Sequence, residues 1–197
     1  MASMGRQIAY LLSQIRMKNK KLPLQKVVDR IVGEPILLVL WVKKSLLEKK
    51  ISGKKPEKIL VYKLDAIGDG ILSLPMIKLI KENNRKANIF VVCSKNNFPV
   101  FDKQEFIDKI VVLNSERPSF QEISQIIKEL KKEKFDLAID AGQSSNISAI
   151  MARLTAKRTS GFFKERSLRN KVHDYLAKIK NDSHMVLNYL ELIKMLK

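Results

Sequence analysis

The sequence predicts an α/β fold, in which helices cover both faces of a parallel β-sheet, preceded by a basic helical extension. Two observations predict this fold class. Short runs of consecutive apolar residues, as expected of strands buried on both faces, alternate with segments whose apolar residues recur at helical spacing. The chain has 197 residues, 45% of them hydrophobic, which is enough for one domain with a substantial core and an appendage.

The extension covers residues 1–55 and holds 13 Lys or Arg against 3 Asp or Glu, a net charge of +10 out of +18 for the whole chain. Its first part predicts an amphipathic helix that ends before Pro23. A second helical stretch starts near Val27, runs on through Gly33 and Pro35, and ends at a lysine pair. The polar segment 52–56 predicts a linker, so we place the domain boundary at residues 55 and 56.

Three structures are compatible with this extension. Its apolar helical faces and basic residues favour a helix lying on an anionic membrane surface, through residues 1–50. Alternatively, the second helix packs on the domain, or the segment is partly disordered. The apolar run Ile36–Val42 has only seven residues, whereas a membrane-spanning helix needs roughly 20, so this run cannot cross a bilayer.

Beyond the linker, strand and helix signals alternate at short intervals. The predicted strands are 59–62, 88–93, 109–113, 136–140 and 159–163. The predicted helices are 71–83, a short turn at 98–103, 119–132, 145–156, and a last helix at 182–197 that Asp182 or Ser183 would cap. This βαβ alternation predicts a Rossmann-like parallel sheet over residues 56–197.

Composition excludes several classes of protein. One cysteine, Cys93, at the end of an apolar run, and two histidines rule out a disulfide framework and make a zinc site improbable, so no metal is expected. The N-terminus lacks the compact apolar segment of a secretory signal. We therefore expect a reducing, cytoplasmic location, at the inner face of the membrane if the extension binds lipid.

Familiar phosphate-binding motifs are incomplete. The segment 68–73 has two glycines of a dinucleotide fingerprint, but Ser73 stands where the third belongs, and no acid ends the second strand. Gly53-Lys54-Lys55 lacks the rest of a P-loop. The lysines are not interleaved with aromatic residues, and no helix-turn-helix or zinc module is present, so nucleic-acid binding is not expected.

The junction between the first strand and the following helix is the strongest functional signal. The turn Asp65–Gly70 is flanked by residues that tolerate unusual backbone angles, and Asp69 lies in it. Ligands of open α/β sheets bind at the carboxyl ends of strands, beside helix N-termini. Asp69 therefore stands where a carboxylate could meet a reacting hydroxyl. The structural alternative is a helix N-cap, a position that Asp favours.

Four segments carry a resemblance to a known family. They are Lys58–Asp69 (KILVYKLDAIGD), Leu74-Pro75, Phe135–Asp140 (FDLAID) and Ser160–Phe162 (SGF). In order and spacing they resemble the N-terminal half of family-nine glycosyltransferases, the ADP-heptose:lipopolysaccharide heptosyltransferases. The final segment, with His184 and Tyr189–Leu192, is similar to the helix that precedes the second domain of those enzymes. The similarity covers about residues 57–197.

The resemblance implies one half of a GT-B fold, whose first domain binds a glycolipid acceptor and whose second binds the nucleotide sugar. It implies that Asp69 is the general base, which takes the acceptor hydroxyl proton in a single, inverting displacement. The acceptor-binding residues that it suggests lie beside Asp69 and after two later strands: Gly68, Gly70, Gln143, Ser144, Ser145, Lys164, Arg166 and Arg169. The basic residues among them could equally be solvated surface.

Two further polar residues are interpreted as structural. Asp140 ends a buried strand before Gly142, where an Asp commonly holds loop amides. His184 lies in the first turn of the last predicted helix, where packing or surface exposure is the usual role.

The resemblance also predicts an absence, because the sequence stops at Lys197, where the donor domain would begin. We expect no cofactor, and we expect the co-substrate, a nucleotide sugar such as ADP-heptose, to bind that missing domain. Three interpretations remain open: a fragment of a longer product, half of a split enzyme with a donor-domain partner chain, or a non-catalytic module that binds glycolipid or membrane.

Overall fold

The structure is a computed structural model that describes residues 24–46, 55–64, 66–113, 119–143 and 145–196. Six parallel strands form one sheet in the order β3-β2-β1-β4-β5-β6. The strands are β1 (Lys58–Lys63), β2 (Asn88–Ser94), β3 (Lys109–Leu113), β4 (Phe135–Asp140), β5 (Ala156–Phe162) and β6 (Tyr175–Ala177). The predicted Rossmann-like parallel sheet is confirmed.

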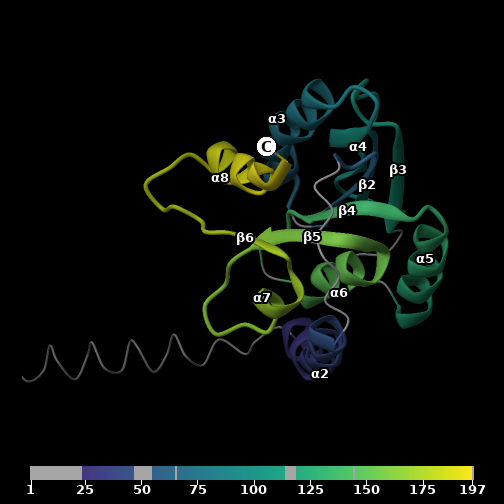
Figure 1. Cartoon of the computed structure of the whole chain (residues 1–197), viewed down its shortest axis with the longest axis vertical. Coiled ribbons are helices and arrows are strands. Elements are labelled where there is room, and N and C mark those ends of the chain that lie inside the picture. Colours follow the sequence, from purple (N-terminus) through teal and green to yellow (C-terminus); the bar gives the residue numbers. More distant parts are fainter. Residues whose placement is uncertain (1–23, 47–54, 65, 114–118, 144, 197) are drawn as a thin grey trace, which may run out of the picture.

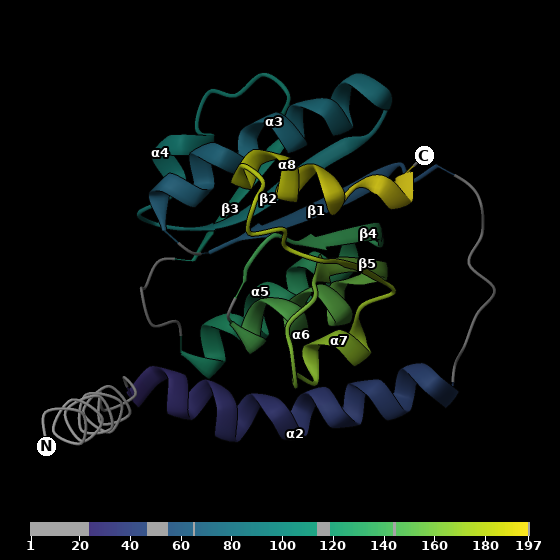
Figure 2. The same cartoon turned by 90° about the vertical axis from the view of Figure 1, so that its left-hand side faces the viewer.

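Helices cover both faces of this sheet (Figures 1 and 2). On one face lie α3 (Ile67–Asn83), α4 (Phe98–Phe101), α8 (Met185–Glu191) and the 3-10 turn Lys194–Leu196. On the other lie α5 (Phe120–Lys132) and α6 (Asn146–Thr155), with α7 (Arg169–Val172) beside α6. Alternate residues of β1 point into the two layers: Ile59 and Val61 into the first, Leu60 and Tyr62 into the second. This alternation explains why β1 is an unbroken apolar run.

Helix α2 (Leu24–Leu46) forms a further helical layer, which lies across α6 and α7 on the side away from the sheet (Figure 2). Its inward residue Leu37 is fully buried, in a cluster with Ala149, Ile150 and Val172. At Gly33 a Cβ atom would lie 2.8 Å from the Cβ of Asn146, so only glycine permits this close approach.

The far end of α2 is tied to the domain by polar contacts. The Lys44 ammonium donates to the His173 carbonyl oxygen at 2.6 Å and lies 3.0 Å from an Asp174 carboxylate oxygen. Among the three alternatives for the extension, residues 24–46 therefore show packing on the domain. The predicted first helix, up to Pro23, lies outside the described residues. No helix in the described segments is long and apolar enough to cross a membrane.

Several sequence predictions need correction. Helix α3 begins at Ile67, not at residue 71, and none of the described glycines has a positive φ, so Gly68 and Gly70 are ordinary helical residues and not a strained turn. The last helix is shorter than predicted, starts at Met185, and is capped by His184, whose Nδ1 accepts from the Val186 amide, and not by Asp182 or Ser183. Helix α7 and strand β6 were not predicted, since each has only three or four residues.

Candidate functional site

The strand order places a topological switch point between β1 and β4. The chain leaves β1 toward β2 on one side, whereas β4 begins the run of strands on the other side. The two strands are in register, with Tyr62 opposite Asp140, and the Ala141 amide donates to the Tyr62 carbonyl at 3.1 Å. Open α/β sheets bind ligands at such a point, outside the carboxyl ends of the strands. This edge is therefore the candidate site.

Asp69 lies at this edge, on the first turn of α3. It is the third residue of the helix, while Ala66 occupies the N-cap position and makes no side-chain capping bond. The N-cap alternative for Asp69 is therefore wrong. The Asp69 carboxylate is 34% exposed, and its Oδ2 lies 3.9 Å from the Nζ of Lys63. A partly exposed carboxylate at a helix N-terminus is accessible to a ligand, and its negative charge is stabilised by the helix dipole.

Lys63 is the residue that the sequence did not reveal. It is the last residue of β1, and its side chain is fully buried, with Nζ 5.7 Å from the centre of the Tyr189 ring. The Lys63 carbonyl oxygen accepts from the buried Asn97 side chain at 3.4 Å, which connects the end of β1 to the start of α4. A buried lysine needs a charged or aromatic partner. Here Asp69 of α3 is the charged partner and Tyr189 of α8 is the aromatic partner.

The two glycines beside Asp69 differ in their surroundings. A Cβ atom at Gly68 would meet nothing within 4 Å, whereas one at Gly70 would be in ordinary contact with Val100 and Asn97. The open space beside Gly68 adjoins the first turn of α3, where free backbone amides point outward. Ser73 lies one turn further along α3, and its buried hydroxyl donates a hydrogen bond to the Gly70 carbonyl oxygen at 2.6 Å.

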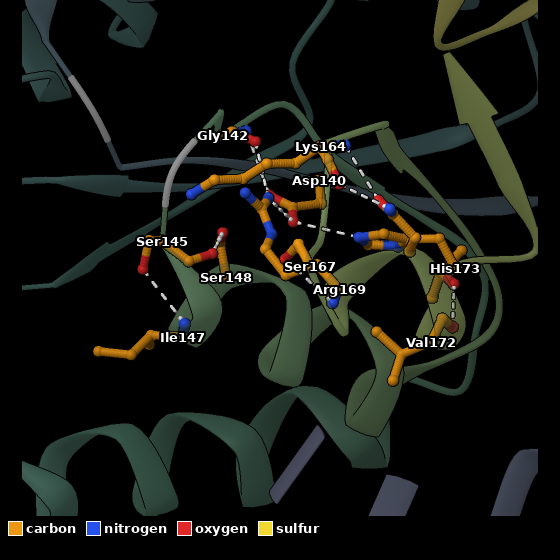
Figure 3. Close-up of polar contacts among 12 residues, drawn as sticks. Asp140, Gly142, Ser145, Ile147, Ser148, Lys164, Ser167, Arg169, Val172 and His173 are labelled. Carbon is orange, nitrogen blue, oxygen red and sulfur yellow. Dashed lines mark hydrogen bonds and ion pairs between the residues drawn. The ribbon is translucent and has the colours of Figure 1, made fainter. Parts of the chain in front are cut away.

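Asp140, at the end of β4, is the centre of a buried ionic cluster (Figure 3). Its Oδ1 accepts from the Gly142 amide at 3.1 Å, as the structural interpretation predicted. Its Oδ2 lies 2.7 Å from Nη2 of Arg169 and 3.4 Å from Nε2 of His173, and all three side chains are fully buried. Burial alone would raise the pKa of Asp140, but Arg169 and His173 outweigh it and hold that pKa at about 2.

The cluster corrects the prediction for Arg169. We expected this arginine to meet acceptor phosphates or carboxylates, yet its Nη2 donates to Asp140 and to the Gly142 carbonyl at 2.8 Å inside the protein. Arg169 therefore holds the loop that follows β4 and cannot reach a ligand at the surface. Glycine is also needed at position 161, because a Cβ atom there would overlap the His173 ring.

The other predicted acceptor residues lie around the same edge. Gln143 is half-buried, and its side-chain amide nitrogen lies 3.7 Å from the Met185 sulfur. Ser145 caps α6, since its hydroxyl accepts from the Ile147 amide at 3.2 Å (Figure 3). Lys164 and Arg166 are exposed in the loop after β5. Ser144 lies outside the described residues, so its role stays a prediction, as do the acceptor roles of the rest.

Two other features bear on the chemistry. The described part of the chain contains no group of His, Cys, Asp or Glu residues that could hold a metal ion. A cavity of about 600 Å³ lies away from Asp69, between the C-terminal end of α3 and the α8 segment, lined by residues such as Pro56, Asn84, Leu187 and Lys194. It adjoins the amino end of β1, where α/β sheets do not normally bind substrates, so we assign the site to the carboxyl edge.

Comparison with solved structures identifies the fold. A family-nine glycosyltransferase from Veillonella parvula superimposes with a TM-score of 0.63 at 19% identity, over 71% of this chain and 41% of that one. Escherichia coli heptosyltransferase WaaC with ADP gives a TM-score of 0.59 at 18% identity, over 68% of this chain and 46% of the enzyme. The E. coli ADP-heptose lps heptosyltransferase II gives 0.58 at 18% identity, over 68% and 39% of the two chains.

These values show a shared fold, and the chain spans less than half the length of each of these enzymes. The described domain therefore shares the Rossmann-like α/β fold of these glycosyltransferase structures, which is the fold that the sequence resemblance implies. No protein-family model and no curated protein matches the sequence.

Proposed function

We propose that this chain is the acceptor-binding half of a heptosyltransferase-like glycosyltransferase that acts in lipopolysaccharide core synthesis. The observation that carries the proposal is Asp69. It is a partly exposed carboxylate on the first turn of a helix, at the switch point of a sheet whose fold is shared with heptosyltransferases. In this proposal the acceptor glycolipid binds along the carboxyl edge of the sheet, next to Gly68 and the loop after β4.

In the proposed reaction, Asp69 accepts the proton of the acceptor hydroxyl while that oxygen forms a bond to the anomeric carbon. The bond from this carbon to the nucleoside diphosphate breaks, and the diphosphate leaves with the electron pair. A single displacement inverts the anomeric centre, and general base catalysis of this kind contributes about 10²- to 10⁴-fold. We propose that the nucleotide sugar, ADP-heptose or a relative, binds a second domain that faces this one.

Lys63 is a positioning residue in this proposal. Its ammonium is fixed by burial between Asp69 and the Tyr189 ring, so it draws one carboxylate oxygen toward β1. The other oxygen is then held toward the open side of the helix, where an acceptor hydroxyl would lie. A preoriented base is more effective than a freely rotating one, because the reacting geometry is set before the substrate binds.

Reconstitution tests the proposed activity. The 197-residue chain is mixed with a donor-domain polypeptide from a heptosyltransferase, together with ADP-heptose and a lipid A-core acceptor. We expect transfer that depends on both polypeptides and yields a product of inverted anomeric configuration. Retained configuration would contradict the single displacement. Binding of the acceptor without any transfer would instead support a non-catalytic glycolipid-binding module.

A further inference from the structure

Helix α2 has two apolar faces, and only one of them is covered. The inward face carries Gly33 and Leu37 against α6 and α7. The opposite face presents a row of large apolar side chains that are between 45% and 79% exposed: Val32, Leu38, Val39, Val42 and Leu46. The positions 32, 39, 42 and 46 recur at spacings of seven, three and four, so they lie on one side of the helix. We call these five residues the outer stripe.

The outer stripe is largely exposed, because α2 packs on α6 and α7 through its other face. Single exposed apolar residues are common on soluble proteins, but a contiguous row along one helix indicates a binding surface. Helix α2 lies beyond α6 and α7 from the sheet (Figure 2), and the exposed stripe residues are on the side of α2 opposite the buried Leu37.

Charge indicates what covers the stripe. Residues 1–55 carry a net charge of +10, and within α2 the exposed Lys43 follows Val42 directly. Lys171 of α7 adds another cation beside α2, with its Nζ 5.5 Å from the centre of the Trp41 ring. A second copy of the chain would bring two such basic segments together, which their mutual repulsion opposes. An anionic bilayer can bind both features, because its acyl chains accept the apolar side chains and its headgroups attract the basic residues.

We infer that α2 lies flat in the headgroup region of an anionic membrane, with the outer stripe inserted and the inward face still packed on α6 and α7. A helix of 23 residues is about 35 Å long, and no described helix can span a bilayer, so binding in the plane is the available mode. This inference rests on α2 alone and does not depend on the chemistry of Asp69.

The orientation of α2 sets that of the candidate site. Gly33, nearer the start of α2, contacts Asn146, the first residue of α6 after the carboxyl end of β4. Lys44, near the end of α2, contacts Asp174, which lies just before the amino end of β6. The helix thus runs antiparallel to the strands. With α2 in the membrane plane, the strands also run along the membrane, and the edge that holds Asp69 opens sideways beside the lipid surface.

Vesicle sedimentation of the full chain tests this docking. We expect wild-type protein to sediment with vesicles of mixed phosphatidylglycerol and phosphatidylcholine, and less with phosphatidylcholine alone. The Val39→Gln/Val42→Gln double variant, which keeps the net charge, should bind at least about tenfold more weakly, since two inserted side chains are lost. The matched control is Ile71→Gln/Leu187→Gln, which removes two other exposed apolar side chains on the opposite face of the sheet. It should bind like the wild type.

A fluorescent label locates the insertion. Burial raises the pKa of the Cys93 thiol to about 12 and shields it, so a maleimide dye should react only with an introduced cysteine. A polarity-sensitive dye at Val39→Cys should shift to the blue with anionic vesicles, while the same dye at Leu187→Cys should not.

Three results would overturn the inference. One is absence of wild-type sedimentation with anionic vesicles. Another is equal binding by the two double variants while both keep the wild-type melting temperature. The third is a wild-type dimer in solution that the Val39→Gln/Val42→Gln variant converts to a monomer, which would show that a second copy covers the outer stripe.

Discussion

Replacing Asp69 with asparagine is expected to lower sugar transfer by the reconstituted enzyme by about 10²- to 10⁴-fold, the usual contribution of a general base. The amide has the same shape and can still lie beside the Lys63 ammonium, which is 3.9 Å from the Asp69 carboxylate, but it cannot take a proton. The free energy of unfolding should fall by only about 1 to 2 kcal/mol, the cost of weakening one polar interaction. Initial rates at saturating substrates and thermal melting, measured on the same preparation, check both expectations.

The Lys63→Met variant tests the positioning role of Lys63 separately from the base itself. It keeps the Asp69 carboxylate but removes the ammonium that orients it, so transfer should fall less than in Asp69→Asn, with the Michaelis constant for the acceptor nearly unchanged. If Asp69→Asn instead loses most of its stability and retains turnover, the carboxylate serves to neutralise buried Lys63, and the catalytic role is refuted.

Arg169→Leu is expected to give the largest loss of stability, about 3 to 5 kcal/mol, because it leaves the buried Asp140 carboxylate without its closest charge partner. Removing both members in Arg169→Leu/Asp140→Asn should cost less than Arg169→Leu alone, since no unpaired charge then remains. Chemical denaturation of the two variants, with Asp140→Asn completing the double-mutant cycle, measures the coupling. Additive losses would mean that the pair is not energetically coupled.

The same cluster predicts how stability depends on acid. The folded pKa of Asp140 is held at about 2, below an ordinary value of about 3.9. The contribution of this carboxylate is therefore fully present above pH of about 4 and is lost as the pH falls toward about 2. Denaturation curves of wild type and Asp140→Asn should differ in their pH dependence only within this window.

The sequence predicted most of the sheet because its strands are buried on both faces. Runs such as Ile59–Tyr62 have no polar residue, so their strand character needs no tertiary information. Strand β6 was missed for the opposite reason. It is a three-residue edge strand, and its residues Tyr175 and Leu176 are only partly buried, so its apolar pattern is too short to distinguish from a loop.

The polar residues of the site were harder to predict, because their roles depend on contacts distant in sequence. Lys63 and Tyr189 are 126 positions apart and meet only in the folded chain. Arg169 was predicted to bind the acceptor, or else to be solvated, because it follows Lys164 and Arg166 in a basic loop, but its partner Asp140 is 29 residues away. One signal was available: an Asp that ends a buried strand needs a partner, and a nearby arginine can supply it.

Helix α2 was predicted only in part. Its length and apolar run were evident, but both faces are apolar, so periodicity could not decide between packing and membrane binding. Gly33 was the signal that could have decided, because a glycine inside a helix often has a packing role. Here it permits the close approach of α2 to Asn146.

The central claim, that these residues bind the acceptor and that the nucleotide sugar binds elsewhere, is tested most directly by NMR titration of the purified 197-residue chain. We predict that a soluble lipid A-core oligosaccharide perturbs the amides of Gly68, Asp69, Gly70 and Gln143, and that ADP-heptose perturbs none of them. Perturbation of residues 68–73 by ADP-heptose, or movement confined to the cavity near Pro56 and Lys194, would contradict the account.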